Sequence, residues 1–379
     1  MIISRLIAKN WRNFQHIDVP LRERQFIVGP TGSGKSNLLD IFRFLRDIVK
    51  TDGGGFQKAV KVRGGVSKIR CLSARQDPEI AIEIHIADAL DAPAKWRYGV
   101  GFRQQPRGHR HTYLTHERVW KDNKLLLDRP DENDKEDPDR LTQTALEQSA
   151  ANAAFREIAL FLQNVTYLHL VPQLIRSGDA IQGRIIEDDP YGQGFLERIA
   201  SMHPSTRRSR LKKIEHTLKI AVPQFEKLEF VRDNTGRPHL QVRYSHWHSN
   251  EARQHEDQFS DGMLRLIGLL WSLLEKDAIV LLEEPELSLN IGTVSELAPS
   301  ISKLQRSQRS QVLVSTQSDV LLIEPGIDGR EVLLLIPEKV GTVVKISSDI
   351  DYIRALLEAG LTAGEVVLTR YPEQLSLLE

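Results

Sequence analysis

The distribution of apolar residues predicts strands in the first thirty residues and a helix directly after them. Apolar and polar side chains alternate in segments 2–9 and 16–21, and the short run 25–28 is mostly apolar, which is typical of β-strands. From 35 to 50 the apolar residues recur every three or four positions, as on the buried face of an amphipathic helix. The Asp-Gly-Gly-Gly run at 52–55 predicts where this helix ends.

Strand-like alternation continues to about residue 128 and then gives way to helical spacing. Segments 80–86, 96–102 and 119–127 carry apolar residues in a mostly period-two pattern, which predicts antiparallel strands. A charged, proline-containing stretch at 129–140 predicts a solvated loop. Helices are predicted at 141–162, 194–202 and 206–222, followed by a hairpin of strands 227–232 and 239–244.

The last third of the chain alternates helices with short apolar strands. Residues 278–282 form a continuous apolar run, which is typical of a parallel strand covered on both faces. Alternation of helices with such strands predicts an α/β fold. The other predicted elements here are helices 264–275, 294–308 and 349–358 and strands 312–316, 332–336 and 340–346.

Composition excludes several classes of protein. The 51 lysine and arginine residues balance 51 acidic residues, which excludes a uniformly basic nucleic-acid coat but not a local basic patch. The single cysteine, Cys71, excludes internal disulfides and cysteine-rich zinc sites. Apolar runs stay shorter than the roughly 18 residues of a membrane span, and the N-terminus lacks an apolar signal core. We therefore expect a cytoplasmic protein without membrane association.

A phosphate-binding loop is predicted between the apolar strand 26–28 and the helix that begins near residue 35. The segment fits the pattern G-x-x-x-x-G-K-[ST], whose glycines let backbone N–H groups surround phosphate oxygens at a helix N-terminus. Lys35 is expected to neutralise the β- and γ-phosphates, and Ser36 to ligate Mg²⁺. The predicted nucleotide-binding residues are Gly29, Pro30, Thr31, Gly32, Ser33, Gly34, Lys35, Ser36 and Asn37.

An acidic turn, Glu283-Glu284-Pro285-Glu286, follows the apolar strand 278–282. Glu283 stands where an aspartate usually holds the shell of the Mg²⁺ ion, and its extra methylene favours a contact through water. Glu284 is predicted to orient or deprotonate the attacking water. The role of Glu286 stays open between a site residue and a solvated turn.

A third motif, Phe259-Ser260-Asp261-Gly262-Met263-Leu264-Arg265, precedes the acidic turn by about 20 residues. Taken alone, Ser260 reads as a helix N-cap. In order with the other two motifs, it resembles the Ser-Gly-Gly-Gln signature of ATP-binding-cassette (ABC) ATPases. The whole chain resembles the RecF, SMC and OLD branch of these ATPases, and more closely the AAA-labelled ATP-binding proteins of bacterial defence and genome-maintenance loci. The residues that carry the resemblance are 10–14, 63–65, 167–172, 259–265 and 281–289.

The resemblance implies an α/β P-loop NTPase fold, an ABC-ATPase head with an antiparallel N-terminal β lobe and a helical insertion. It implies three parts. Residues 1–129 would form the N-terminal ATPase lobe with the P-loop, and 130–222 the helical insertion. Residues 223–379 would form the C-terminal ATPase lobe with the signature, the Walker B strand and the switch.

The resemblance also implies that ATP, with Mg²⁺, clamps two heads together in a head-to-tail homodimer. Ser260 and Gly262 of one head would contact the γ-phosphate held by the P-loop of the other, and Ser288 and Leu289 look like the D-loop between them. ATP hydrolysis would separate the heads. The effector is expected to be a separate protein, in phage defence or DNA repair.

The chain departs from the family pattern after strand 312–316, where Gln317 replaces the usual histidine. An amide donates a hydrogen bond but carries no charge, so we predict a switch role for Gln317 and slow turnover. Arg12 and Arg63 are each left open between a phosphate contact and a structural role.

Other functions also stay open. A non-hydrolysing nucleotide sensor or scaffold is favoured by Gln317 and opposed by Glu284. The ATPase subunit of a membrane transporter is opposed by the absence of a confident Q-loop glutamine. A DNA clamp would use Arg207, Arg208 and Arg210, which also fit the exposed face of a helix. The choice of ATP over GTP is not decided by a loop that contacts only phosphates.

Overall fold

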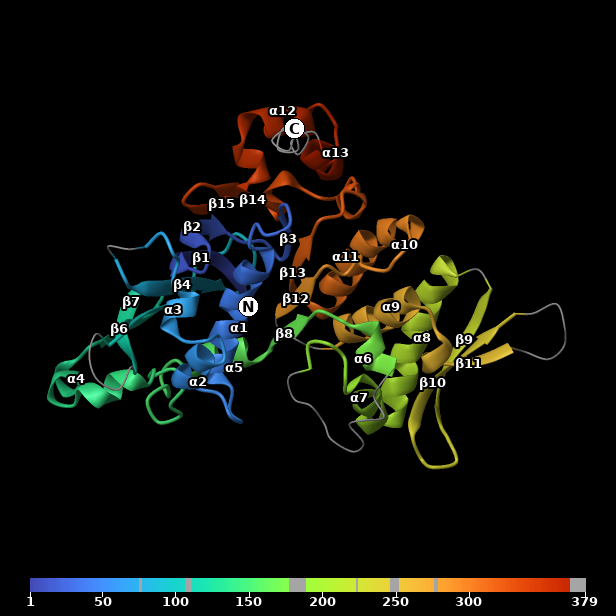
Figure 1. Ribbon diagram of the computed structural model, residues 1–379, viewed down its shortest axis with the longest axis horizontal. Coiled ribbons are helices and arrows are strands. Elements are labelled where there is room, and N and C mark those ends of the chain that lie inside the picture. The colour runs from blue at the N-terminus through green and yellow to red at the C-terminus, as the bar shows by residue number, and fades with distance from the viewer. Residues whose placement is uncertain are drawn as a thin grey trace.

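The computed structural model describes residues 1–74, 77–105, 111–176, 189–222, 224–245, 252–275 and 279–368. Figure 1 shows an N-terminal sheet on one side, a central sheet in the middle and a small third sheet on the opposite side, with α12 (Asp351–Glu358) and α13 (Ala363–Leu368) at the top. Within these residues, no helix is both long and apolar enough to span a membrane.

The N-terminal sheet is antiparallel, as the alternating pattern predicts. Its predicted strand at 119–127 is divided by a turn in which Asp122 (φ 46°) and Asn123 (φ 64°) are both left-handed, the signature of a tight hairpin. The strand order is β2 (Phe14–Pro20), β1 (Ile2–Trp11), β4 (Ile80–Ala87), β5 (Trp96–Gln104), β6 (Thr112–Lys121) and β7 (Lys124–Arg129).

The central sheet is parallel except for one edge strand, and it confirms the predicted α/β fold. Among the described strands of this sheet, β15 alone pairs antiparallel, with β14. The order is β15 (Gly341–Ile346), β14 (Val332–Glu338), β3 (Arg24–Val28), β13 (Gln311–Thr316), β12 (Ile279–Glu283) and β8 (Val165–Leu168).

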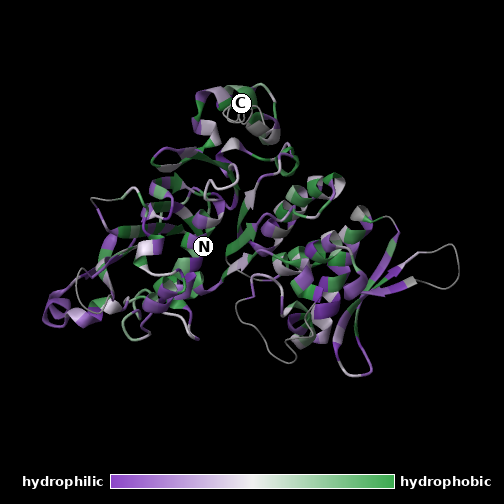
Figure 2. Ribbon diagram, viewed as in Figure 1, coloured by the Kyte–Doolittle hydropathy of each residue, from purple (hydrophilic) through white to green (hydrophobic). Residues whose placement is uncertain are grey.

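Alternate residues of the central strands enter two different hydrophobic cores. Ile27 and Leu313 pack in the core shared with the N-terminal sheet and α1 (Lys35–Val49). Phe26 and Val314 pack in the core shared with α9 (Asp261–Leu273) and α11 (Leu297–Gln308). Figure 2 shows these central strands in the colour of apolar residues. Burial on both faces therefore explains their continuous apolar runs.

The third sheet contains the predicted hairpin of β9 (Phe225–Arg232) and β10 (Pro238–Tyr244), with β11 (Ala252–His255) at its edge. The helices α7 (Phe195–Ser201) and α8 (Pro204–Ala221) share its core. Short helices complete the fold: α2 (Phe56–Lys61), α3 (Val66–Ile69), α4 (Glu132–Glu136), α6 (Pro172–Arg176) and α10 (Ile291–Ser295), with 3-10 turns at 138–142, 256–258, 320–322, 329–331 and 347–349.

The segment 130–222 is less helical than predicted. Only α5 (Arg156–Gln163) remains of the helix predicted at 141–162. The Thr144 hydroxyl instead accepts the backbone N–H of Glu147, and the Asn152 amide donates to the carbonyl oxygen of Leu146; such side-chain-to-backbone bonds compete with helix formation. The segment also contains β8, a strand of the central sheet, so the predicted division into three parts stays a prediction.

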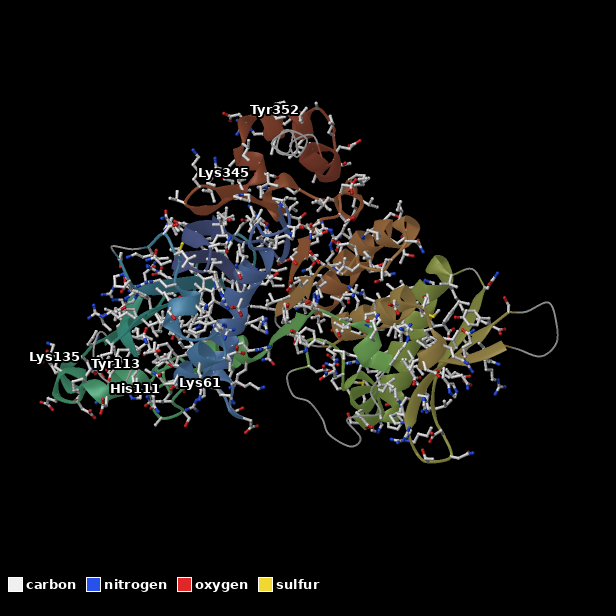
Figure 3. The ribbon with its side chains drawn as sticks, viewed as in Figure 1. Lys61, His111, Tyr113, Lys135, Lys345 and Tyr352 are labelled. Carbon is white, nitrogen blue, oxygen red and sulfur yellow. The ribbon has the colours of Figure 1, made fainter. Side chains whose placement is uncertain are left out.

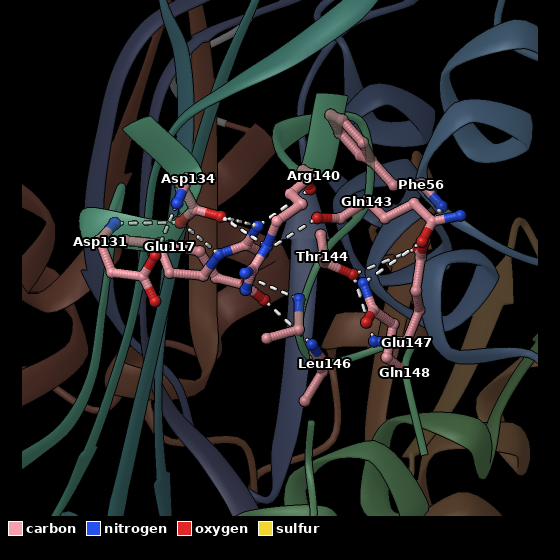
Figure 4. A network of polar contacts seen from close by, with 12 residues as sticks. Phe56, Glu117, Asp131, Asp134, Arg140, Gln143, Thr144, Leu146, Glu147 and Gln148 are labelled. Carbon is pink, nitrogen blue, oxygen red and sulfur yellow. Dashed lines mark hydrogen bonds and ion pairs between the residues drawn. The ribbon is translucent and has the colours of Figure 1, made fainter. Parts of the chain in front are cut away.

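A buried ionic network attaches residues 130–147 to the last strands of the N-terminal sheet (Figure 4). The guanidinium of Arg129 donates to Glu117 at 3.0 Å and to Asp134 at 2.9 Å, and all three side chains are at most 5% exposed. Glu117 also accepts the backbone N–H groups of residues 145 and 146. The segment is therefore held by charge-assisted hydrogen bonds rather than by helix formation.

Glu147 lies beside this network and accepts the backbone N–H of Phe56 at 2.6 Å. Burial raises the pKa of Glu147 to about 7. Between pH 4.5 and 7 the folded chain therefore keeps a proton that the unfolded chain releases, so the contribution of Glu147 to stability is lost as pH rises through this range.

We predict that Glu147→Gln removes this pH dependence. The free energy of unfolding of the variant should rise relative to that of the parent between pH 4.5 and 7, by at most about 1.4 kcal/mol per pH unit. Urea unfolding at four pH values measures the difference, with the exposed Glu132→Gln as control. A difference that stays constant with pH would contradict the prediction.

Candidate functional site

The predicted phosphate loop connects the end of β3 to the start of α1. Gly32 and Gly34 adopt φ angles of 81° and 98°, which disfavour residues with a Cβ atom. A Cβ at Gly34 would also lie 2.2 Å from the amide nitrogen of Asn13. The helix α1 begins at Lys35 with Gly34 as its N-cap residue, which has no side chain to bond the first N–H groups of the helix. This geometry fits an anion at the helix N-terminus.

Asn13 holds the loop from the N-terminal sheet, although its role was not predicted from the sequence. Its amide donates to the carbonyl oxygen of Ser33 and to the hydroxyl of Thr342, both at 2.8 Å, and its carbonyl oxygen accepts from Asn37 at 2.8 Å. One side chain thus joins the loop, the first turn of α1 and β15. The chain offers no local spacing signal for a contact between residues 13 and 342.

Lys35 lies inside the loop and is 6% exposed. Its ammonium donates to the carbonyl oxygens of Gly29 at 2.9 Å and Pro30 at 3.2 Å. Burial lowers the pKa of Lys35, against the opposing effect of the glutamates that follow β12. The hydroxyl of Ser33 is buried in the same loop without a described hydrogen-bond partner. A buried cation and an unsatisfied hydroxyl both fit a phosphate group.

The two predicted metal ligands contact each other: Ser36 lies in the first turn of α1, and Glu283 lies at the end of β12. The hydroxyl of Ser36 donates to one carboxylate oxygen of Glu283, and the hydroxyl of Tyr167 donates to the other. Burial, followed by the neighbouring Glu283, raises the pKa of Tyr167, so its hydroxyl stays protonated. Hydroxyl and carboxylate oxygens are ligands that suit Mg²⁺, so these residues fit the ion that the P-loop implies.

Glu284, Gln317 and Thr31 form a chain of hydrogen bonds beside the loop. The amide of Gln317 donates to Glu284 at 2.5 Å, and its carbonyl oxygen accepts from the hydroxyl of Thr31 at 2.9 Å. Glu284 has a left-handed backbone with φ 44°, an uncommon conformation for glutamate. The structure therefore brings together the residues predicted as base, switch and phosphate loop.

The role of Glu286 is open from the sequence alone. In the structure its carboxylate accepts hydrogen bonds from the end of β13 and the residue that follows it. One carboxylate oxygen accepts the hydroxyl of Thr316 at 2.7 Å and the backbone N–H of Gln317 at 3.1 Å. The other oxygen is buried without a described partner, and burial raises the pKa of Glu286. These contacts fix the position of Gln317 next to Glu284.

The signature residues face the acidic turn of their own chain. The Ser260 hydroxyl caps α9 by accepting the N–H of Met263 at 3.2 Å, as the alternative interpretation predicted. A Cβ at Gly262 would lie 2.6 Å from the carbonyl oxygen of Ser288, a residue with φ 64°. Asp261 accepts from Arg176 in α6 at 2.5 Å. Among the described residues, Ser260 bonds to Met263 and Gly262 lies against Ser288 and Leu289, not against the phosphate loop.

Two arginines that were candidates for phosphate contact are engaged in ion pairs on α1. Arg63 is buried and contacts Asp40 at 2.8 Å and Asp47 at 2.9 Å, while Arg12 contacts Asp40 at 3.0 Å. Burial by itself would raise the pKa of Asp40, but the ion pairs and hydrogen bonds with Arg63 and Arg12 have the larger combined effect and lower it. These contacts favour the structural alternative for both arginines.

The basic stretch on α8 is also partly engaged within the chain. The guanidinium of Arg207 lies 3.9 Å from the ring of Phe230, and that of Arg210 lies 5.3 Å from the ring of Trp271. Arg208 is exposed. Two of the three predicted nucleic-acid contacts therefore have structural partners already.

Most of this chain matches one protein family. The family described as "AAA domain, putative AbiEii toxin, Type IV TA system" matches residues 26–324, from β3 to beyond Gln317. The chain belongs to this family. The matched span contains the phosphate loop, the signature and the acidic turn of the AAA domain. A comparison with curated proteins finds no match.

The fold of this AAA domain is similar to that of SMC heads, as the sequence predicted. A crystal structure of an SMC head bound to the C-winged helix domain of ScpA gives a TM-score of 0.57 at 13% identity, covering 91% of this chain and 98% of that chain. An SMC head with an extended coiled coil, bound to the C-terminal domain of ScpA and derived from Pyrococcus furiosus, gives 0.53 at 14% identity, with 94% and 99% covered. The chain thus belongs to an AAA family and has a fold similar to that of SMC heads.

We predict that Gly262→Ala destabilises the domain although alanine is the better helix former. The added Cβ would meet the backbone oxygen of Ser288, which has little room to move, so the clash should cost about 1–3 kcal/mol. Gly292→Ala in α10 meets only Asn290, at 3.5 Å, and should be neutral or stabilising by up to about 1 kcal/mol. Equal unfolding midpoints for the two variants would refute the close approach.

Proposed function

We propose that this AAA domain hydrolyses ATP at the site formed by the phosphate loop and the acidic turn. The observation that carries the proposal is the contact of Gln317 with both Glu284 and Thr31, which places a carboxylate beside the phosphate loop. Gly29 to Asn37 would bind the phosphates, and Lys35 would neutralise them. Turnover is expected to be slow, because Gln317 has no positive charge with which to stabilise the negative charge that develops on the phosphate in the transition state.

In this proposal Glu284 orients the attacking water and accepts its proton. The left-handed backbone at Glu284 and the hydrogen bond from Gln317 hold the carboxylate in place before a nucleotide binds. Ser36 and Glu283 would hold Mg²⁺, which supplies positive charge to the β- and γ-phosphate oxygens. The hydroxyl of Ser36 could ligate the ion through an oxygen lone pair while it still donates its hydrogen to Glu283.

We further propose that ATP joins two copies of the domain in a head-to-tail dimer. Ser260 and Gly262 support this, because in the single chain Ser260 caps α9 and Gly262 lies against Ser288, so a second copy would be needed for them to meet a phosphate. A separate effector protein would respond to the dimer. The family description, which names a type IV toxin–antitoxin system, supports a setting in defence against phage, and DNA repair is the alternative.

A non-hydrolysing nucleotide sensor is the second candidate function. It is favoured by the same hydrogen bond of Gln317, since the amide occupies a Glu284 oxygen that a base needs. DNA clamping through α8 is weaker, because of the three arginines proposed for it only Arg208 is exposed.

We predict that Glu284→Gln lowers ATP hydrolysis by about 10²–10⁴-fold, because the variant loses the general base but keeps the size of the side chain. Phosphate release with Mg²⁺-ATP measures turnover. Light scattering in the same buffer should show the variant trapped by ATP at twice the 43.1 kDa of one chain. The exposed Glu338→Gln is the matched control and should behave as the parent does.

The outcomes separate the two candidate functions. Turnover in the parent together with its loss in Glu284→Gln supports an ATPase. A parent that binds ATP without releasing phosphate supports the sensor. A parent that hydrolyses ATP while Glu284→Gln turns over equally fast would remove Glu284 from the chemistry.

A further inference from the structure

Tyr167 is a residue outside the three motifs that contacts the proposed metal site. It lies on β8, where it pairs in register with Leu281 of the neighbouring strand β12. The side chain is buried, and its hydroxyl donates to a carboxylate oxygen of Glu283. Since Ser36 donates to the other oxygen, each oxygen of Glu283 has its own hydroxyl donor.

The ring of Tyr167 is itself held from α1. The guanidinium carbon of Arg43 lies 4.0 Å from the centroid of this ring, a close cation–π contact. Arg43 and Ser36 belong to the same helix, about two turns apart on one face. A continuous series of contacts therefore starts and ends on α1: Ser36 to Glu283 of β12, Glu283 to Tyr167 of β8, and Tyr167 to Arg43.

We propose that Tyr167 is a positioning residue for Glu283, so that this carboxylate faces a Mg²⁺ ion bound at Ser36. The proposal rests on the assignment of Ser36 and Glu283 to the metal under the proposed function. Glutamate has one more rotatable bond than the aspartate usual at this position. A longer side chain needs an additional restraint to present its oxygens in one orientation, and groups that hydrogen-bond to metal ligands supply such restraint.

The hydroxyl can be separated experimentally from the packing of the ring. The ring of Tyr167 belongs to the core shared by α1 and the N-terminal sheet, and phenylalanine would keep that packing. Tyr167→Phe removes only the group that contacts Glu283. Tyr113→Phe is the matched control, because its hydroxyl also donates to a carboxylate, Asp139 at 3.2 Å, far out on the N-terminal lobe (Figure 3).

The experiment measures the affinity of the full chain for a fluorescent ATP analogue, first in EDTA and then with excess Mg²⁺. We expect Mg²⁺ to tighten binding to the parent, and this gain to fall about tenfold in Tyr167→Phe, the lower end of what loss of such a partner costs a metal site. The affinity in EDTA should not change. Tyr113→Phe should match the parent under both conditions.

A double variant tests whether Tyr167 acts through Glu283. In the Glu283→Ala background the gain from Mg²⁺ is already lost, so adding Tyr167→Phe should change nothing further. The proposal is overturned by an undiminished gain in Tyr167→Phe, by equal losses in EDTA and in Mg²⁺, or by a further loss in the Glu283→Ala background.

Failure of this proposal is distinguishable from failure of the proposed hydrolysis. A parent that binds the analogue with a Mg²⁺-dependent gain but releases no phosphate refutes hydrolysis and leaves the role of Tyr167 supported. A parent whose affinity does not respond to Mg²⁺ refutes the assignment of Tyr167 and Glu283 to the metal, whether or not phosphate is released.

Discussion

The burial of β3 on both faces is the constraint on which the rest of the structure depends. Its apolar side chains alternate between two cores, Ile27 toward the N-terminal sheet and Phe26 and Val28 toward α9 and α11. A strand in this position can move only if both cores move with it. Because the phosphate loop begins where β3 ends, its position follows from the packing of both halves of the molecule.

Parallel strands then bring the remaining groups to the same edge of the sheet. The carboxyl ends of β12 and β13 present Glu283, Glu284 and Gln317 beside the loop that follows β3. Ligands of open α/β sheets bind at this edge, because the loops after parallel strands converge there. Four segments that are distant in sequence therefore lie together: the loop after β3, the ends of β12 and β13, and β8, which contributes Tyr167. No single motif in the sequence predicts all four.

The sequence predicts those parts of the site whose chemistry lies in consecutive residues. The loop from Gly29 to Ser36 and the acidic turn at Glu283 are short motifs, each typical of one chemical role, so the sequence predicts that they lie together in one site. Asn13 and Tyr167 could not be assigned, because no local pattern points to their partners: Asn13 joins Ser33 and Asn37 to Thr342, and Tyr167 contacts Glu283. The helix predicted at 141–162 failed for a related reason: side chains such as Asn152 bond to the nearby backbone, which a helical apolar pattern does not reveal.

The charges of the site bear on the role proposed for Gln317. Glu283, Glu284 and Glu286 each favour the charged form of Lys35, and these three acidic residues outnumber the single cation of the loop before a nucleotide arrives. A polyphosphate adds more negative charge at close range, where Coulomb energies in a partly buried site are large. Gln317 brings no charge to offset it, although its amide still orders Glu284 and Thr31. Under the proposed function, binding would then rely on a divalent cation, whose position would depend on how firmly Glu283 is held.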